Sequence, residues 1–69
     1  MDVDVSKLIS RIDLLAEEMG KSPNAVYIES GVGKNFKSNL NRANPSAGKI
    51  TMLANYFGVS VDYLLGKTD

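Results

Sequence analysis

The chain has 69 residues, enough for one small domain, and it contains neither cysteine nor histidine. Disulfides, zinc fingers, iron–sulfur clusters and histidine-based acid–base chemistry are therefore excluded within it. Eight basic and eight acidic residues give a formal net charge of zero, so the chain lacks the overall basic character of many nucleic-acid binders. Its hydrophobic fraction of 43% is that of a folded globular domain.

No apolar run approaches the roughly 20 residues that span a bilayer. The N-terminus, Met1-Asp2-Val3-Asp4, lacks the basic and apolar regions of a signal peptide. We therefore expect a soluble, intracellular protein with no membrane partner.

The first predicted element is an amphipathic helix over about residues 6–19. Ser6 is expected to cap its start, and Gly20 to end it. Its apolar residues recur at intervals of three and four, which places them on one face. They are Val5, Leu8, Ile9, Ile12, Leu15, Ala16 and Met19.

A second, shorter helix is predicted over residues 23–29. Ser22 is a suitable N-cap, and Pro23 suits the first helical position. Gly31 and Gly33 then permit a sharp reversal, in which Gly31 adopts a positive φ. Val32 between them is expected to point into the core.

A third helix is predicted over about residues 34–42, with only Phe36 and Leu40 as its apolar face. Its other residues are basic, amide or hydroxyl side chains, and Asn and Ser are mediocre helix formers. A helix of this composition favours a functional role, because amide groups both donate and accept hydrogen bonds.

Two more helices are predicted, over residues 46–57 and 61–65. In the former, Ile50, Leu53, Ala54 and Phe57 are expected to face inward, and Ser46 provides a cap. Ser60 is expected to cap the latter. With no strand signals, the chain is predicted to be an all-α, compact five-helix bundle forming a single domain over residues 1–69.

Charge is distributed unevenly along the chain. Residues 30–61 contain no acid and four basic residues, namely Lys34, Lys37, Arg42 and Lys49. This stretch predicts a local positive field on a neutral molecule.

A helix, a tight glycine turn and a second helix with a polar outer face make up the helix-turn-helix arrangement. Residues 23–44, with Gly31-Val32-Gly33 at the turn, resemble the DNA-binding module of Cro-like phage repressors, the XRE family. The run from Leu53 to Gly66 is similar to the C-terminal part of many members. The resemblance covers about Leu8 to Gly66.

The resemblance implies a lambda-repressor-like fold, with helix 34–42 in the major groove and the preceding helix across the phosphate backbone. By position it assigns base contacts to Lys34, Asn35, Ser38 and Asn39. It assigns phosphate contacts to Ser22, Asn24, Arg42 and Asn44. Lys37 is added to the phosphate-contacting set because its long side chain can place the ammonium on phosphate. Asn can bind adenine and Lys guanine, while Arg, Lys and Ser suit phosphate.

The predicted function is therefore that of a sequence-specific transcriptional regulator, a repressor in the cytoplasm of a bacterium or a phage-infected cell. Its expected partner is duplex DNA, bound as a homodimer on a pseudo-palindromic operator with half-sites about 34 Å apart. The last helix, near Val59, Tyr63 and Leu64, is the candidate dimer surface. We expect no enzyme activity, cofactor, metal or small-molecule substrate, because the carboxylates lie on outer helix faces.

Four residues depart from the family pattern: Lys37, Tyr27, Pro23, which replaces a polar residue that often contacts phosphate, and Ala43, which replaces a frequent Gly after the third helix. Lys37 stands where the family usually has an aliphatic residue, so either its stem lies along the apolar surface or Phe36 fills that place. Tyr27 replaces a common small Ala, which predicts a wider spacing between the second and third helices. The alternative function is a protein-interaction module, antitoxin-like or regulatory, that keeps the fold without contacting DNA.

Overall fold

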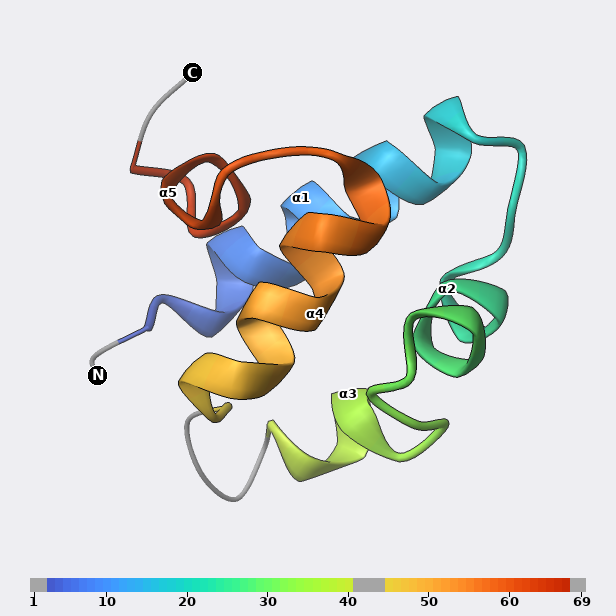
Figure 1. Cartoon of the computed structure of the whole chain (residues 1–69), viewed down its shortest axis with the longest axis horizontal. Coiled ribbons are helices and arrows are strands. Elements are labelled where there is room, and N and C mark those ends of the chain that lie inside the picture. Colours follow the sequence, from blue (N-terminus) through green and yellow to red (C-terminus); the bar gives the residue numbers. More distant parts are fainter. Residues whose placement is uncertain (1–2, 41–44, 68–69) are drawn as a thin grey trace.

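A computed structural model describes residues 3–40 and 45–67 of the chain, and these residues form five α-helices and no strand (Figure 1). The predicted all-α, five-helix fold is confirmed. The helices are α1 (Val5–Glu18), α2 (Pro23–Ser30), α3 (Phe36–Asn39), α4 (Ala47–Phe57) and α5 (Val61–Leu64).

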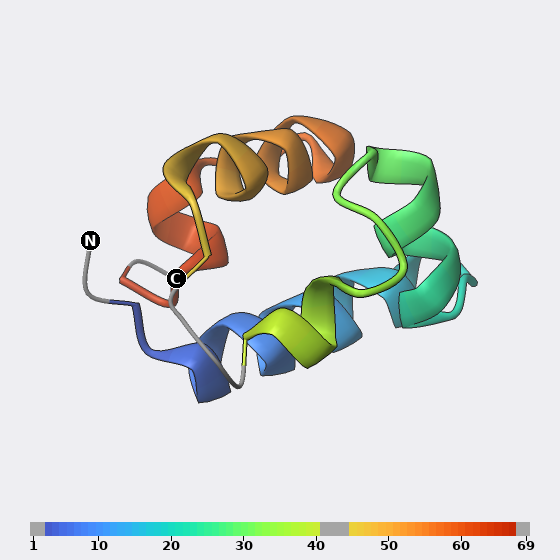
Figure 2. The same ribbon diagram turned by 90° about the horizontal axis from the view of Figure 1, so that it is seen from below.

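Four of the helices form a closed ring around the core. Helix α1 contacts α2, α2 contacts α4, α4 contacts α5, and α5 returns to α1. Figure 2 shows this ring from below, with α1 and α4 on opposite sides of it and α2 and α5 at its two ends. The short α3 lies along one edge of the ring, so one of its faces packs inward and the other faces solvent (Figures 1 and 2).

The core contains apolar side chains from every helix. No polar or charged residue of the described chain is buried. Removing each large apolar side chain from water contributes roughly 1.5–3 kcal/mol, which is the main stabilising contribution in a domain of this size. The largest fully buried residues are Leu8, Ile12, Val26, Tyr27, Phe36, Ile50, Leu53 and Leu64.

Four of the helices begin with a side chain that caps the backbone. Ser22, Ser46 and Ser60 accept hydrogen bonds from the backbone N–H three residues later, as predicted. The prediction that Ser6 caps the first helix is wrong, because Asp4 accepts the bond from Lys7 N at 3.1 Å. The helix consequently begins at Val5 rather than at residue 6.

Helix α1 ends as predicted, at a left-handed glycine. Gly20 has φ 70°, its N–H bonds to Glu17 O at 3.0 Å, and Lys21 N bonds to Ala16 O at 2.9 Å. This pair of bonds is a Schellman motif, which needs a residue without a Cβ. The prediction that Met19 joins the buried face is wrong: Met19 lies at the C-cap and is 43% exposed.

Candidate nucleic-acid interface

The connection from α2 to α3 reverses the chain at two glycines of positive φ. Gly31 has φ 92° and Gly33 has φ 96°, and Gly33 N donates to Tyr27 O at 3.0 Å. Between them Val32 is 6% exposed, which confirms the prediction that it points into the core. The end of the Met52 side chain, from α4, lies beside Gly31: a methyl group at this position would be 2.8 Å from Cε of Met52.

Helix α3 is shorter than the predicted residues 34–42. It comprises one turn, Phe36–Asn39, and Lys34 and Asn35 form the turn that precedes it. A hydrogen bond of 3.1 Å from Phe36 N to Gly33 O closes that preceding turn. Asn35 has φ −93° and ψ 7° and makes no side-chain cap, so the regular helix starts only at Phe36. Residues 41 and 42 lie outside the described part of the chain.

The inner face of α3 consists of Phe36 and Leu40, as predicted. They are 2% and 7% exposed, and the ring of Phe36 packs against that of Tyr27 with 5.5 Å between centroids. Lys37 is exposed, and Phe36 is buried in the core beside it. Tyr27 fills the space between α2 and α3 at 1% exposure.

The outer face of this segment carries every described residue assigned to base contact. Lys34, Asn35, Ser38 and Asn39 are all exposed. Successive helical residues are separated by about 100°, so Ser38 points directly away from Phe36 and Leu40. Lys37 and Asn39 flank Ser38 on its two sides.

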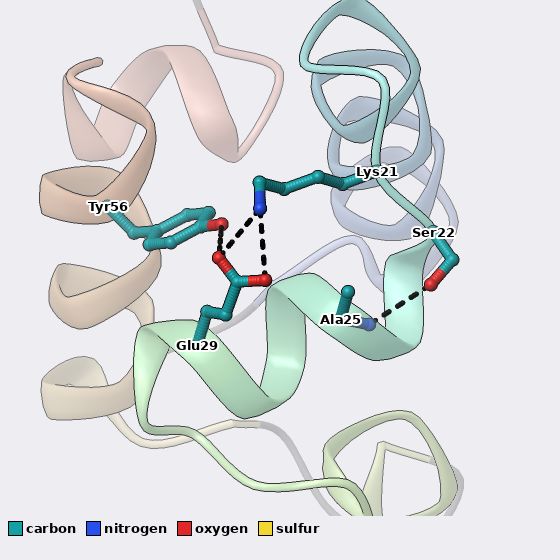
Figure 3. Close-up of polar contacts among 5 residues, drawn as sticks. All are labelled: Lys21, Ser22, Ala25, Glu29 and Tyr56. Carbon is teal, nitrogen blue, oxygen red and sulfur yellow. Dashed lines mark hydrogen bonds and ion pairs between the residues drawn. The ribbon is translucent and has the colours of Figure 1, made fainter.

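The residues assigned to phosphate contact are spread more widely. Ser22 and Asn24 are exposed at the start of α2, and Lys37 is exposed on α3. The hydroxyl of Ser22 accepts a bond of 3.2 Å from Ala25 N, which leaves its own proton free to donate (Figure 3). Because α2 has eight residues, about 12 Å of helix axis separates its two ends. Arg42 and Asn44 lie outside the described residues.

Glu29, the last acidic residue before the basic stretch of residues 30–61, has its charge balanced by a neighbouring lysine. Its carboxylate accepts two hydrogen bonds from Lys21 Nζ, at 2.9 and 3.0 Å, and one from the Tyr56 hydroxyl at 2.9 Å (Figure 3). The bond from Lys21, followed by that from Tyr56, lowers the pKa of Glu29. Sequence reasoning missed this group, because Lys21 lies before the helix that carries Glu29, and Tyr56 lies 27 residues away on another helix.

The candidate dimer surface on the last helix is partly corrected. Leu64 is fully buried and cannot contact a partner. Tyr63 is half-buried, and the Arg11 guanidinium lies 4.3 Å from its ring centroid. Val59 is also half-buried, so both Val59 and Tyr63 remain partly accessible to a partner.

Comparison with family models, curated proteins and solved structures returns no match. In the part of the chain that the structure describes, no helix is long and apolar enough to cross a membrane. No group of three or more Asp and Glu residues in that part is placed to bind a metal ion. The chemistry of the exposed α2–α3 surface is therefore the basis for assigning a function.

Proposed function

We propose that this chain binds duplex DNA through the surface formed by residues 34–39, with α2 positioned against the phosphate backbone. One observation carries the proposal. The basic and amide side chains of residues 34–39 all face solvent, while Val32, Phe36 and Leu40 fix the segment from behind. The polar side chains of residues 34–39 would not be stabilised by burial in the apolar core. Their hydrogen-bond donors and acceptors face solvent, where a partner could bind them.

The exposed groups suit the edges of bases. The amides of Asn35 and Asn39 match the donor and acceptor pair of adenine in the major groove, and the ammonium of Lys34 matches the two acceptors of guanine. Ser38, which points farthest from the core, can donate or accept. The four residues form the proposed base-contacting set.

The other polar residues suit the sugar–phosphate backbone. Ser22 and Asn24 at the start of α2, and Lys37 on α3, would set register and contribute affinity without choosing a sequence. Arg42 and Asn44, assigned by position in the sequence, complete this proposed set.

The size of the segment favours a dimer. A single helical turn is about 6 Å long, and base pairs are stacked about 3.4 Å apart, so one chain reads about two of them. Two copies on a pseudo-palindromic site, with centres about 34 Å apart, would double the number of bases that are read. The proposed biological role is accordingly that of a dimeric transcriptional repressor in the cytoplasm of a bacterium or a phage-infected cell.

A salt series tests the proposal. Affinity for a pool of random duplexes should fall linearly on a log–log plot, with a slope of about −0.9 for each neutralised phosphate. Lys37→Gln should make this slope shallower, whereas the matched variant Lys67→Gln, at the end of the described chain beyond α5, should leave it unchanged. Absence of binding at the lowest salt concentration would contradict the proposal, as would equal effects of the two substitutions.

A second candidate function, a protein-interaction module, is favoured by one observation. Ile28 in α2 is 62% exposed and Met52 in α4 is 40% exposed, and the end of the Met52 side chain lies beside Gly31. Exposed apolar side chains beside the α2–α3 turn would suit a protein partner better than a polyanion. Capture of a stoichiometric protein partner that Ile28→Ser abolishes, together with absent DNA binding, would favour this function.

A further inference from the structure

A groove of about 360 Å³ lies where α1 meets the end of α5. Helix α5 and the first half of α1 lie at one end of the molecule and α2 at the other, in both views (Figures 1 and 2). The groove is therefore separate from the start of α2, where the proposed phosphate contacts lie. It is lined by Ser6, Lys7, Ser10, Arg11, Leu14 and Gly66.

The lining residues from α1 form an ordered set. Ser6 and Ser10 are four residues apart, as are Lys7 and Arg11, so each pair is separated by one helical turn on the same face. Leu14 follows Ser10 by a further turn and is 45% exposed. Two cations and two hydroxyls are thus followed along the helix by an exposed apolar side chain.

Residues of α5 and of the turn after it lie against both cationic side chains. The guanidinium of Arg11 lies 4.3 Å from the ring centroid of Tyr63, a contact that orients it without using its N–H donors. The stem of Lys7 passes Gly66 so closely that a methyl group there would be 3.1 Å from Cδ and 3.2 Å from Cβ of Lys7. Gly66, at φ 76°, therefore leaves room for the lysine stem.

The polar groups of the groove are not satisfied within the described chain. Over residues 3–40 and 45–67 the one ion pair is that between Lys21 and Glu29. Asp4, one turn before Lys7, directs its carboxylate to the backbone N–H of Lys7. Among the residues that the structure describes, Lys7 and Arg11 thus have no anionic partner, and their donors face solvent where an anion could bind.

We propose that this groove binds a small organic anion, a phosphate ester or carboxylate attached to an apolar group. The anionic oxygens would accept hydrogen bonds from Arg11, Lys7 and the serine hydroxyls, and the apolar part would contact Leu14. Arg suits both head groups because its planar donors match two oxygens at once. The volume lies in the range of about 300–1,000 Å³ that is common for ligand sites.

Phenyl phosphate, compared with inorganic phosphate, is the probe for this site. Titration followed by ¹H–¹⁵N NMR should shift the amides of residues 6–14 and 66 and leave those of α3 unchanged. The ring should improve affinity about tenfold over inorganic phosphate, equivalent to about 1.4 kcal/mol. Leu14→Ser should remove this difference, and Arg11→Gln should weaken the binding of both anions at least about tenfold.

Two further variants make the result decisive. Lys7→Gln should also weaken the binding of both anions. Because Lys7 is exposed, this variant remains informative if Arg11→Gln loosens the packing of α5. Lys34→Gln, on the proposed DNA surface, should change neither affinity. Shifts spread over the whole chain, or equal affinities of Arg11→Gln and the wild type, would overturn the site. The site would also be overturned if duplex DNA shifted the NMR signals of these amides and phenyl phosphate did not.

Discussion

The hydroxyl of Tyr56 in α4 donates a hydrogen bond of 2.9 Å to the carboxylate of Glu29 in α2, between residues 27 positions apart (Figure 3). Lys21, before α2, donates to the same carboxylate. The last turn of α2 is thereby tied to the last turn of α4. Because that turn of α2 continues directly into the Gly31–Gly33 reversal, these contacts help to fix the direction in which residues 34–39 leave α2.

The first prediction concerns stability at acid pH. Lys21 and Tyr56 lower the pKa of Glu29 from its ordinary value of 4.5. The ionised carboxylate therefore contributes fully to the stability of the fold above pH 4.5. This contribution is lost as pH falls through the lowered pKa of the folded protein. Urea midpoints of the wild type should exceed those of Glu29→Gln between pH 6 and 9 by a constant amount, and this difference should shrink below about pH 4.5.

At alkaline pH the same contacts predict a second decrease in the stability difference between the wild type and Glu29→Gln. The hydrogen bond to Glu29 raises the pKa of Lys21 above 10.5, so its contribution is complete below that pH and is lost as pH rises through the raised value. Burial, followed by the bond to Glu29, raises the pKa of Tyr56 above 10.0. A difference between wild type and Glu29→Gln that stays constant from pH 2 to pH 12 would contradict both declines.

The second prediction is that Tyr27→Phe does not destabilise the protein. The ring of Tyr27 is buried against Phe36, yet its hydroxyl has no hydrogen-bond partner among the described residues. Burial raises the pKa of this phenol, so it is neutral near pH 7. Replacing an unpaired buried hydroxyl by hydrogen should raise the free energy of unfolding by about 1 kcal/mol in urea denaturation. A loss of similar size would show that the hydroxyl is bonded after all.

The third prediction compares the two glycines of the α2–α3 turn. Both have a positive φ, so Gly31→Ala and Gly33→Ala should each cost about 1–2 kcal/mol of backbone strain. A methyl group at Gly31 would also meet Cε of Met52, whereas one at Gly33 meets nothing within 4 Å. Because Met52 is 40% exposed and its end is flexible, it can move aside. The two variants should therefore have similar stabilities by chemical denaturation.

A cost more than about 2 kcal/mol larger for Gly31→Ala would mean that Met52 is fixed, and Met52→Ala should then relieve it. That result would show that Met52 is held in place against the turn rather than free to move aside.

Local signals in the sequence predicted most of the fold. Helical periodicity identified the buried faces of α1 and α4, and Ser22 and Ser60 were correctly identified as caps because capping depends on neighbouring residues. The cap of α1 was placed wrongly, since Asp4 and Ser6 are both good caps, and the helix includes Val5, which packs against the core.

Features that depend on contacts between distant residues were not predictable in this way. The start of α3 is set by the turn that follows Gly33, and the two apolar residues of this segment, Phe36 and Leu40, are too few to mark where the helix begins. The contact of Glu29 with Tyr56 depends on the packing of α2 against α4, which no local pattern reveals. For the candidate interface, the sequence identified which residues are polar, and the structure adds that those described are exposed.

The last prediction separates base contact from phosphate contact on the proposed interface. Asn35→Ala and Asn39→Ala each remove an amide that would read one base, so each should reduce discrimination at one position of the site by about 1–3 kcal/mol. Lys37→Gln removes a charge that would contact phosphate, so it should weaken binding to all sequences alike and reduce the salt slope by about 1. Competition binding with a selected site and its single-base variants measures both effects.

Urea denaturation provides the control, because all three side chains are exposed and their loss should leave the core intact. Variants that remain folded and lose affinity equally for every sequence would place Asn35 and Asn39 on the phosphate backbone. Unfolding of the Asn variants would mean that these amides stabilise the turn before α3 and the helix itself. Because Phe36 and Leu40 already fix this segment from the buried side, we expect the folded outcome and a change in base preference.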